Sequence, residues 1–226
     1  MRIYFGGTFD PVHIGHVQLA LELAALFAQG KVYLMPCYKA VHKERVMASA
    51  AQRLAMLQLA TEEYSNLIVD TRELEQDSPS YTYNSLCAIR QEIGTEPLVF
   101  VIGTDSLISF PLWYHSERLA ELTNLIVIER PQASFTIGGT EAVSSHENAR
   151  HYIERVLALG FEEITQPGLL EKYSAGKLIS LKLSQFDVSS TRVRRLAHDK
   201  KPINHLVGDK VADYIKVTNL YQNQEA

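Results

Sequence analysis

Two histidines, His13 and His16, stand three positions apart in the segment GGTFDPVHIGH, residues 6–16. In a helix this spacing places both imidazoles on one side, where they can face the same ligand. Gly6 and Gly7 precede them and allow the backbone to approach a bound group closely. A helix that begins in this segment also directs free backbone N–H groups at that ligand, which suits a phosphate. The segment is therefore a candidate phosphate-binding loop.

The sequence of this loop differs from those of the two common phosphate-binding loops. It is not GxGxxG, and no Gly-Lys-Ser/Thr closes it, so dehydrogenases and P-loop nucleotide hydrolases are both disfavoured. A zinc site is disfavoured because the segment has no HExxH pattern and no obvious third ligand. The remaining alternative is a turn whose histidines only cap or pack. The glycines and the Asp10-Pro11 turn signal shift the balance away from that alternative.

A second group of candidate phosphate ligands lies in the segment SSTRVRR, residues 189–195. Hydroxyl groups at the start of a helix cap its free N–H groups. Arg192 falls in the first turn, where the helix dipole opposes a cation unless an anion binds nearby. A guanidinium also offers a two-pronged contact to phosphate oxygens. The alternative is an ordinary capped helix with a solvated basic face, and Arg195 fits that alternative equally well.

Other candidate ligands stand beside expected strands and helices and are suited to a second substrate. Lys43 follows the strand expected over residues 31–35, where it can neutralise a phosphate, although most single lysines are simply exposed to solvent. After the strand expected over residues 98–102, Gly103 permits close approach of a ligand. Asp105 can accept hydrogen bonds from ribose hydroxyls, or simply cap a helix. Trp113 can stack on a planar ring, although a lone Trp is usually part of the core. Thr82 stands at the start of an expected helix, where a hydroxyl cap is an equally natural explanation.

An alternation of short apolar runs and helical patterns must position these residues. The expected strands are residues 2–5, 31–35, 67–69, 98–102, 125–128 and 177–183. The expected helices are residues 17–28, 50–63, 82–93, 146–155 and 203–217, and one that ends at residue 197 after a cap at Asp187 or Ser189. This order predicts an α/β fold, a Rossmann-like, doubly wound parallel sheet with a small C-terminal helical part. Ligands of such sheets bind at the carboxyl ends of the strands.

Composition and charge argue against several classes of protein. The net charge is −4 with both signs interspersed, without the clustered Lys and Arg that nucleic-acid binding needs. Cys37 and Cys87 form no CxxC, which favours free thiols in a reducing compartment. The amino terminus lacks the apolar stretch of a signal peptide, and the most apolar run, residues 19–28, is too short to span a bilayer. We therefore expect a cytoplasmic protein without nucleic-acid or membrane partners; the oligomeric state stays open, a homodimer included.

The two candidate phosphate-binding segments resemble the signatures of a known enzyme family. Residues 6–16 resemble the T/HxGH signature of the nucleotidyltransferase superfamily. A histidine at position 13 resembles its nicotinate- and nicotinamide-nucleotide adenylyltransferases and its cytidylyltransferases. Residues 189–195 resemble the second signature of the superfamily, which is SSTxxR-like. The resemblance implies the nucleotidyltransferase type of doubly wound sheet.

Further runs are similar to those of the bacterial nicotinate-nucleotide adenylyltransferases. They are SYT at 80–82, GTDSLISFPLWY at 103–114 and the pair Arg130-Pro131. The resemblance extends from residue 1 to about residue 220 and is loosest across 132–176. We therefore expect one domain over residues 1–220 with an elaborated segment at about 132–176, followed by a flexible tail over 221–226.

The resemblance implies adenylyl transfer from ATP to the 5′-phosphate of nicotinic acid mononucleotide, a step of NAD biosynthesis that releases pyrophosphate. The acceptor phosphate attacks in line, and no covalent enzyme intermediate forms. Mg²⁺ is expected to bridge phosphate oxygens, with no protein metal site. Three alternatives stay open: a preference for nicotinamide mononucleotide or use of both acceptors, a cytidylyltransferase, and a catalytically silent nucleotide-binding regulator.

The resemblance also implies which residues act. The catalytic residues are His13, His16, Lys43 and Arg192. The residues that bind ATP are Gly6, Gly7, Thr8, Phe9, His13, His16, Gly103, Asp105, Ser189, Ser190, Thr191 and Arg192. The residues that bind the acceptor are Lys43, Tyr81, Thr82, Asp105, Trp113, Tyr114 and Arg130. In the family the nicotinate carboxylate is received by backbone amides near the residues matched by Thr82 and Tyr114.

Overall fold

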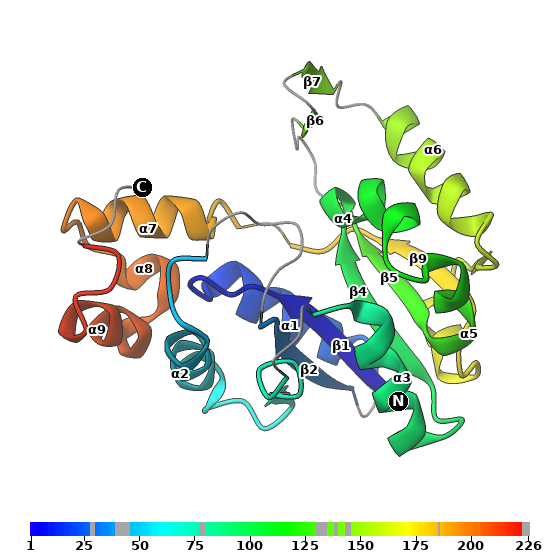
Figure 1. The fold of residues 1–226 in the computed structure, drawn as a ribbon, viewed down its shortest axis with the longest axis horizontal. Helices are drawn as coiled ribbons and strands as arrows, with labels where there is room; N and C mark the ends of the chain where they lie inside the picture. Colours follow the sequence, from blue (N-terminus) through cyan, green and yellow to red (C-terminus); the bar gives the residue numbers. More distant parts are fainter. Residues whose placement is uncertain are drawn as a thin grey trace. The chain divides into compact units, whose positions relative to one another are not determined.

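The structure is a computed structural model, and it describes most of the chain. The described residues are 1–27, 30–38, 46–76, 80–129, 135–137, 140–142, 146–184 and 186–222. The chain divides into two compact units, each built from two separate segments (Figure 1). The first unit comprises Met1–Tyr4 and Tyr81–Leu183, and the second comprises Phe5–Ser80 and Ser184–Ala226.

Seven strands form the main sheet in the order β3-β2-β1-β4-β5-β9-β8. They are β1 (Arg2–Gly7), β2 (Lys31–Pro36), β3 (Leu67–Val69), β4 (Leu98–Gly103), β5 (Asn124–Ile128), β8 (Glu162–Glu163) and β9 (Lys177–Leu181). The pairs β2–β3, β4–β5, β5–β9 and β8–β9 are all parallel. A parallel sheet with long crossovers confirms the predicted α/β class.

The first unit is centred on β4 and β5, whose side chains are almost entirely buried. Leu98, Val99, Leu125 and Ile126 are fully inaccessible to solvent. Continuous apolar runs of this kind are typical of parallel strands covered on both faces. The helices of this unit are α3 (Thr82–Ile93), α4 (Thr104–Ser109), α5 (Leu119–Leu122) and α6 (His146–Leu157), with short 3₁₀ turns η1 (Phe110–Leu112), η2 (Ser116–Arg118) and η3 (Pro167–Glu171).

The helices of the second unit come from both of its segments, residues 5–80 and 184–226. They are α1 (Ile14–Ala25), α2 (Ala50–Thr61), α7 (Ser190–His198), α8 (Asn204–Val207) and α9 (Asp209–Val217). Figure 1 shows α7, α8 and α9, coloured orange to red, close to α2, and α9 packs against α2. At this contact the Lys210 ammonium donates to the carboxylates of Glu62 and Glu63.

Two sequence predictions in the C-terminal part need correction. The single helix expected over 203–217 is two helices, because Gly208 adopts a φ of 82° that breaks the helical backbone. The flexible tail was expected to begin at Tyr221, but this side chain is only 2% exposed and donates a hydrogen bond to Asp10. Burial of the ring and that bond hold the residue in place.

The elaborated segment predicted at about 132–176 contains regular structure in its described part. A two-stranded antiparallel ribbon joins β6 (Phe135–Ile137) to β7 (Thr140–Ala142), and α6, β8 and η3 follow.

Within the described residues, no helix has the length and apolar character needed to cross a membrane.

Candidate active site

The loop that follows β1 is shaped by an aromatic side chain packed beneath its glycines. Phe9 has a positive φ of 49°, which is costly for a residue with a side chain, and it is 2% exposed. Its ring makes edge contacts with Phe5 and His16, at centroid distances of 5.8 and 5.1 Å. A Cβ at Gly7 would lie 2.9 Å from Cζ of that ring. Gly7 is therefore required because any side chain there would displace Phe9.

The two histidines of this loop form a stacked pair at the start of α1. His13 is the N-cap residue of α1 and is buried. The two imidazole rings lie 3.7 Å apart between centroids with an interplanar angle of 21°. The backbone N–H of His13 donates to Nδ1 of His16 over 3.2 Å. Because Nδ1 of His16 accepts, a neutral His16 carries its proton on Nε2, which can then donate to an anion.

Gly15, between the histidines, is not among the residues predicted from the sequence, although it is the glycine of the T/HxGH signature. A Cβ at this position would lie 3.0 Å from Cγ1 of Val188 and 3.2 Å from Nδ1 of His13. The absence of a side chain at Gly15 therefore lets the first turn of α1 pack closely against the imidazole of His13 and against Val188, which leads into α7.

The start of α7 is tied directly to the histidine loop. The hydroxyl of Ser190 donates to the carbonyl of Pro11 over 3.0 Å. Nη1 of Arg194 donates to the carbonyl of Asp10 over 2.7 Å. These bonds join residues 179 and 184 positions apart in the chain. The structure thus brings together the two segments that the sequence identified as candidate phosphate ligands.

The two arginines at the start of α7 have different surroundings. Arg192 donates from Nη1 to the carbonyl and to the carboxylate of Asp187, at 2.7 and 2.8 Å. Arg194 faces the histidine loop and also donates to Oγ1 of Thr191 over 3.2 Å. Arg192 is the arginine predicted from the sequence, and Arg194 is not among the predicted residues. The spacing in the SSTxxR-like signature was the available signal, because the arginine three positions after Thr191 is Arg194.

Two buried ionic side chains lie under the loop, and sequence reasoning assigned a function to neither. Arg53 is 1% exposed, and its guanidinium donates to the carbonyls of Thr8 and Tyr38 at 2.8 and 3.2 Å. Asp10 is 4% exposed, and its carboxylate accepts hydrogen bonds from backbone and side-chain donors. Nothing in the local sequence distinguishes Arg53 from an exposed helical arginine, whereas Asp10 is part of the quoted motif.

The first unit gathers several of the residues predicted to bind the acceptor. The rings of Tyr81 and Tyr114 lie 4.9 Å apart, and Tyr114 is 49% exposed. Tyr83 and His115 extend this group, with their rings 4.7 Å apart. Tyr81 is the N-cap residue of α3 and Thr82 is its first residue, so the amide of Thr82 has no acceptor within the helix. That amide and the adjacent aromatic rings are suited to a planar anion.

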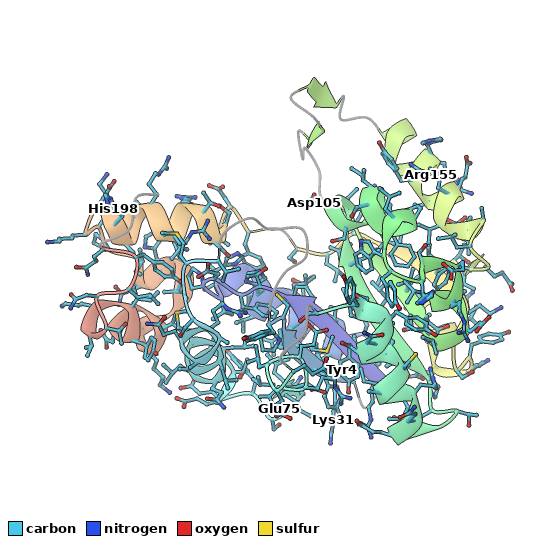
Figure 2. The ribbon with its side chains drawn as sticks, in the orientation of Figure 1. Tyr4, Lys31, Glu75, Asp105, Arg155 and His198 are labelled. Atoms are coloured by element: carbon cyan, nitrogen blue, oxygen red, sulfur yellow. The ribbon has the colours of Figure 1, made fainter. Side chains whose placement is uncertain are left out.

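Trp113, Gly103 and Asp105 also lie in the first unit. The indole of Trp113 packs on Phe110 at a centroid distance of 5.0 Å and donates from Nε1 to Oγ of Ser109 over 3.2 Å. It is therefore held half-buried by its own unit. Gly103 is the N-cap residue of α4, and Asp105 is exposed in the first turn of that helix (Figure 2).

Two predicted ligands, Lys43 and Arg130, lie outside the described residues. Among the residues that are described, no group of three or more His, Cys, Asp or Glu side chains is arranged to hold a metal ion.

A comparison with known families agrees with the fold and the loop geometry. A family model described as cytidylyltransferase-like matches residues 4–196, and the chain belongs to this family. Two relatives that match nearly the whole chain share one enzyme name. It is 35% identical over 218 residues to a Legionella pneumophila (strain Corby) protein named "Probable nicotinate-nucleotide adenylyltransferase", with 96% of this chain and 97% of that protein covered. A Citrobacter koseri protein of the same name is 35% identical over 223 residues, covering 98% and 99%.

A solved structure supports the fold independently. The nicotinic acid mononucleotide adenylyltransferase of Plasmodium falciparum, in complex with NaAD, superposes with a TM-score of 0.68 at 19% sequence identity. The match covers 99% of this chain and 98% of that one. The same enzyme in complex with APC gives a TM-score of 0.66. These matches confirm the nucleotidyltransferase type of sheet that the sequence predicted.

Proposed function

We propose that this protein is a nicotinate-nucleotide adenylyltransferase. It transfers the AMP part of ATP to the 5′-phosphate of nicotinic acid mononucleotide, giving nicotinic acid adenine dinucleotide and pyrophosphate. The observation that carries the proposal is the stacked pair His13–His16 with the start of α7 bonded to the same loop. The names of the full-length relatives agree with this activity.

The chemistry needs two anions aligned and the charge on the leaving pyrophosphate stabilised. We propose that Nε2–H of His16 and the imidazole of His13 donate to phosphate oxygens of ATP. Gly6, Gly7, Thr8 and Phe9 form the backbone against which the nucleotide lies.

The start of α7 supplies the other donors. Its first-turn amides and the hydroxyls of Ser189 and Thr191 lie next to the polyphosphate, while Ser190 ties the helix to the loop. Arg194 supplies positive charge beside the loop, and Arg192 joins it on release from Asp187. Mg²⁺ carried by the phosphate oxygens would neutralise further charge.

The acceptor side is proposed from the first unit. The amides near Thr82 and Tyr114 receive the nicotinate carboxylate, and Tyr81 lines the same position. Trp113 stacks on the pyridine ring, and the carboxylate of Asp105 accepts hydrogen bonds from a ribose, with Gly103 allowing close approach. Lys43 and Arg130 complete the set as phosphate and acceptor ligands. An amide acceptor lacks the negative charge that those N–H groups stabilise, so nicotinamide mononucleotide should be the poorer substrate.

The decisive experiment measures pyrophosphate release by purified protein with ATP, Mg²⁺ and each mononucleotide in turn. We expect rapid release with nicotinic acid mononucleotide and slow release with nicotinamide mononucleotide. Equal rates with both acceptors would establish dual specificity, and activity only with CTP would establish a cytidylyltransferase. Tight ATP binding without pyrophosphate release from any pair of substrates would leave a nucleotide-binding regulator and refute the proposal.

Two wider expectations belong with this proposal. Residues 1–220 act as one nucleotidyltransferase domain whose elaboration at 132–176 has no assigned role, and the protein works in the cytoplasm. The second unit holds the residues proposed for the polyphosphate and the first unit holds most of those proposed for the acceptor.

A further inference from the structure

We propose that Tyr221 is a positioning residue for the histidine loop, acting through Asp10. Only the turnover measurement in its test rests on the function proposed above. Tyr221 bonds to Asp10 in the loop that carries both histidines, and we infer that it acts on them through this loop.

Asp10 is the point at which the loop is fixed to its surroundings. Its carboxylate accepts from the backbone N–H groups of Met47 and Ala48, at 2.8 and 3.1 Å. The hydroxyl of Tyr221 donates to Oδ1 of the same carboxylate over 2.8 Å. A carboxylate that is 4% exposed needs such donors, because burying an unpaired charge is costly. Tyr221 is the side-chain donor among these three.

Tyr221 is itself held firmly where it makes this bond. Its ring is 2% exposed, and its backbone adopts a φ of 66°, which residues with side chains rarely occupy. The neighbouring Leu220 is also buried, and its N–H donates to the carbonyl of Ile215 at the end of α9. Burial, followed by the charge of Asp10, raises the pKa of Tyr221 far above its usual range. The phenol therefore stays protonated and remains a donor.

The loop between Asp10 and the histidines is short, so a shift at Asp10 reaches the imidazoles. Only Pro11 and Val12 separate Asp10 from His13, and the rings of His13 and His16 are in van der Waals contact. The carbonyls of Asp10 and Pro11 also accept from Arg194 and Ser190. Movement of Asp10 would therefore disturb the histidine pair and the contact with α7 together.

The test compares Tyr221→Phe, which removes only the phenol oxygen, with Tyr214→Phe as a matched control. Tyr214 is half-buried on the adjacent α9 and undergoes the same chemical change. Three kinds of measurement are made: kcat and KM for ATP by pyrophosphate release, ATP affinity by calorimetry, and the ring resonances of His13 and His16 in NMR spectra. All are measured well below the melting temperature of each variant. The chain has 8 histidines, so assignment by single His→Gln variants is practical.

For Tyr221→Phe we expect kcat to fall by about tenfold with shifted resonances of both histidines, because small displacements at a site of this kind are costly. Tyr214→Phe should keep both properties of the wild type. Unchanged histidine resonances in Tyr221→Phe would overturn the proposal, whether or not turnover or the melting temperature falls. If Tyr221→Phe fails to fold, Asp10→Asn tests the same anchor, because it preserves the shape and removes the charge that Tyr221, Met47 and Ala48 contact; unchanged histidine resonances in that variant would likewise overturn the proposal.

The design separates this proposal from the function on which it partly rests. If the wild-type protein releases no pyrophosphate, the proposed function fails. The histidine resonances and the ATP affinity then decide the positioning role alone.

Discussion

Gly15→Ala is the substitution that best tests whether the histidine pair works in the geometry described. The new methyl group would lie 3.0 Å from Cγ1 of Val188, and 3.2 and 3.3 Å from Nδ1 and Cε1 of His13. Ordinary contacts begin near 3.4 Å, so these neighbours must move by a few tenths of an ångström. The imidazole of His13 can retreat only by disturbing its stack on His16, whose centroid is 3.7 Å away.

The effect of Gly15→Ala on stability and its effect on turnover should differ in size. Overpacking costs about 1–3 kcal/mol. The better helix propensity of Ala offsets up to about 1 kcal/mol of that cost. A net loss of about 1 kcal/mol lowers the melting temperature of a chain of this size by about 2–4 °C. Displacing the imidazoles should instead reduce kcat/KM by about 10- to 100-fold.

The assay is pyrophosphate release from ATP and nicotinic acid mononucleotide, with thermal unfolding measured on the same samples. Gly168→Ala is the control, because a Cβ there meets nothing within 4 Å and its φ is not positive. It should keep both properties close to those of the wild type. If Gly15→Ala retained kcat/KM within about twofold of wild type, the stacked arrangement would not be needed for catalysis, and the displacement argument would be refuted.

Three further predictions follow from the loop and its contacts. Arg194→Ala should lower kcat/KM by about 100-fold or more, on the scale of one lost transition-state donor. Arg192→Ala should lower it by less, because Arg192 is paired with Asp187. Equal losses of the two variants in steady-state kinetics would contradict this ranking. Gly7→Ala should force the Phe9 ring from its position and so lower the melting temperature. A melting temperature within about 1 °C of wild type would show that the ring moves freely. Because the pKa of Tyr221 is raised in the folded state, its contribution to stability is complete below its unfolded pKa of about 10 and declines as the pH rises above that value. The free energy of unfolding, measured by urea titration, should therefore fall more steeply above about pH 10 in wild type than in Tyr221→Phe, and parallel curves would exclude a raised pKa.

Much of the fold was predictable because its strands are continuous apolar runs and its helices carry clear end signals. Thr82–Ile93 forms α3 with the expected boundaries, since Gly94 ends the pattern with a φ of 58°. Ser189 caps α7 as one of the two expected caps, by accepting from the N–H of Arg192. In contrast, α4 was not predicted, because six residues are too few to show a helical period.

The candidate site was predictable as motifs but not as a network of contacts. The spacing of His13 and His16 indicated that they share one face, and the structure shows the two rings stacked. The buried partners under the loop could not be found in the same way. Arg53 carries a charge within an ordinary helical pattern, and Tyr221 follows the last helix, where sequence alone favours a frayed end. Their roles depend on hydrogen bonds to residues far away in the chain.

The histidine loop depends on a contact between residues 211 positions apart, and this has a consequence for the order of folding. During synthesis the loop emerges before its partners on α7 and beyond α9. Closing so large a span is entropically costly and slow compared with forming local helices. We therefore expect nascent chains that end before residue 184 to lack an ordered nucleotide loop, so that nucleotide binding begins only after α7 and Tyr221 have been translated.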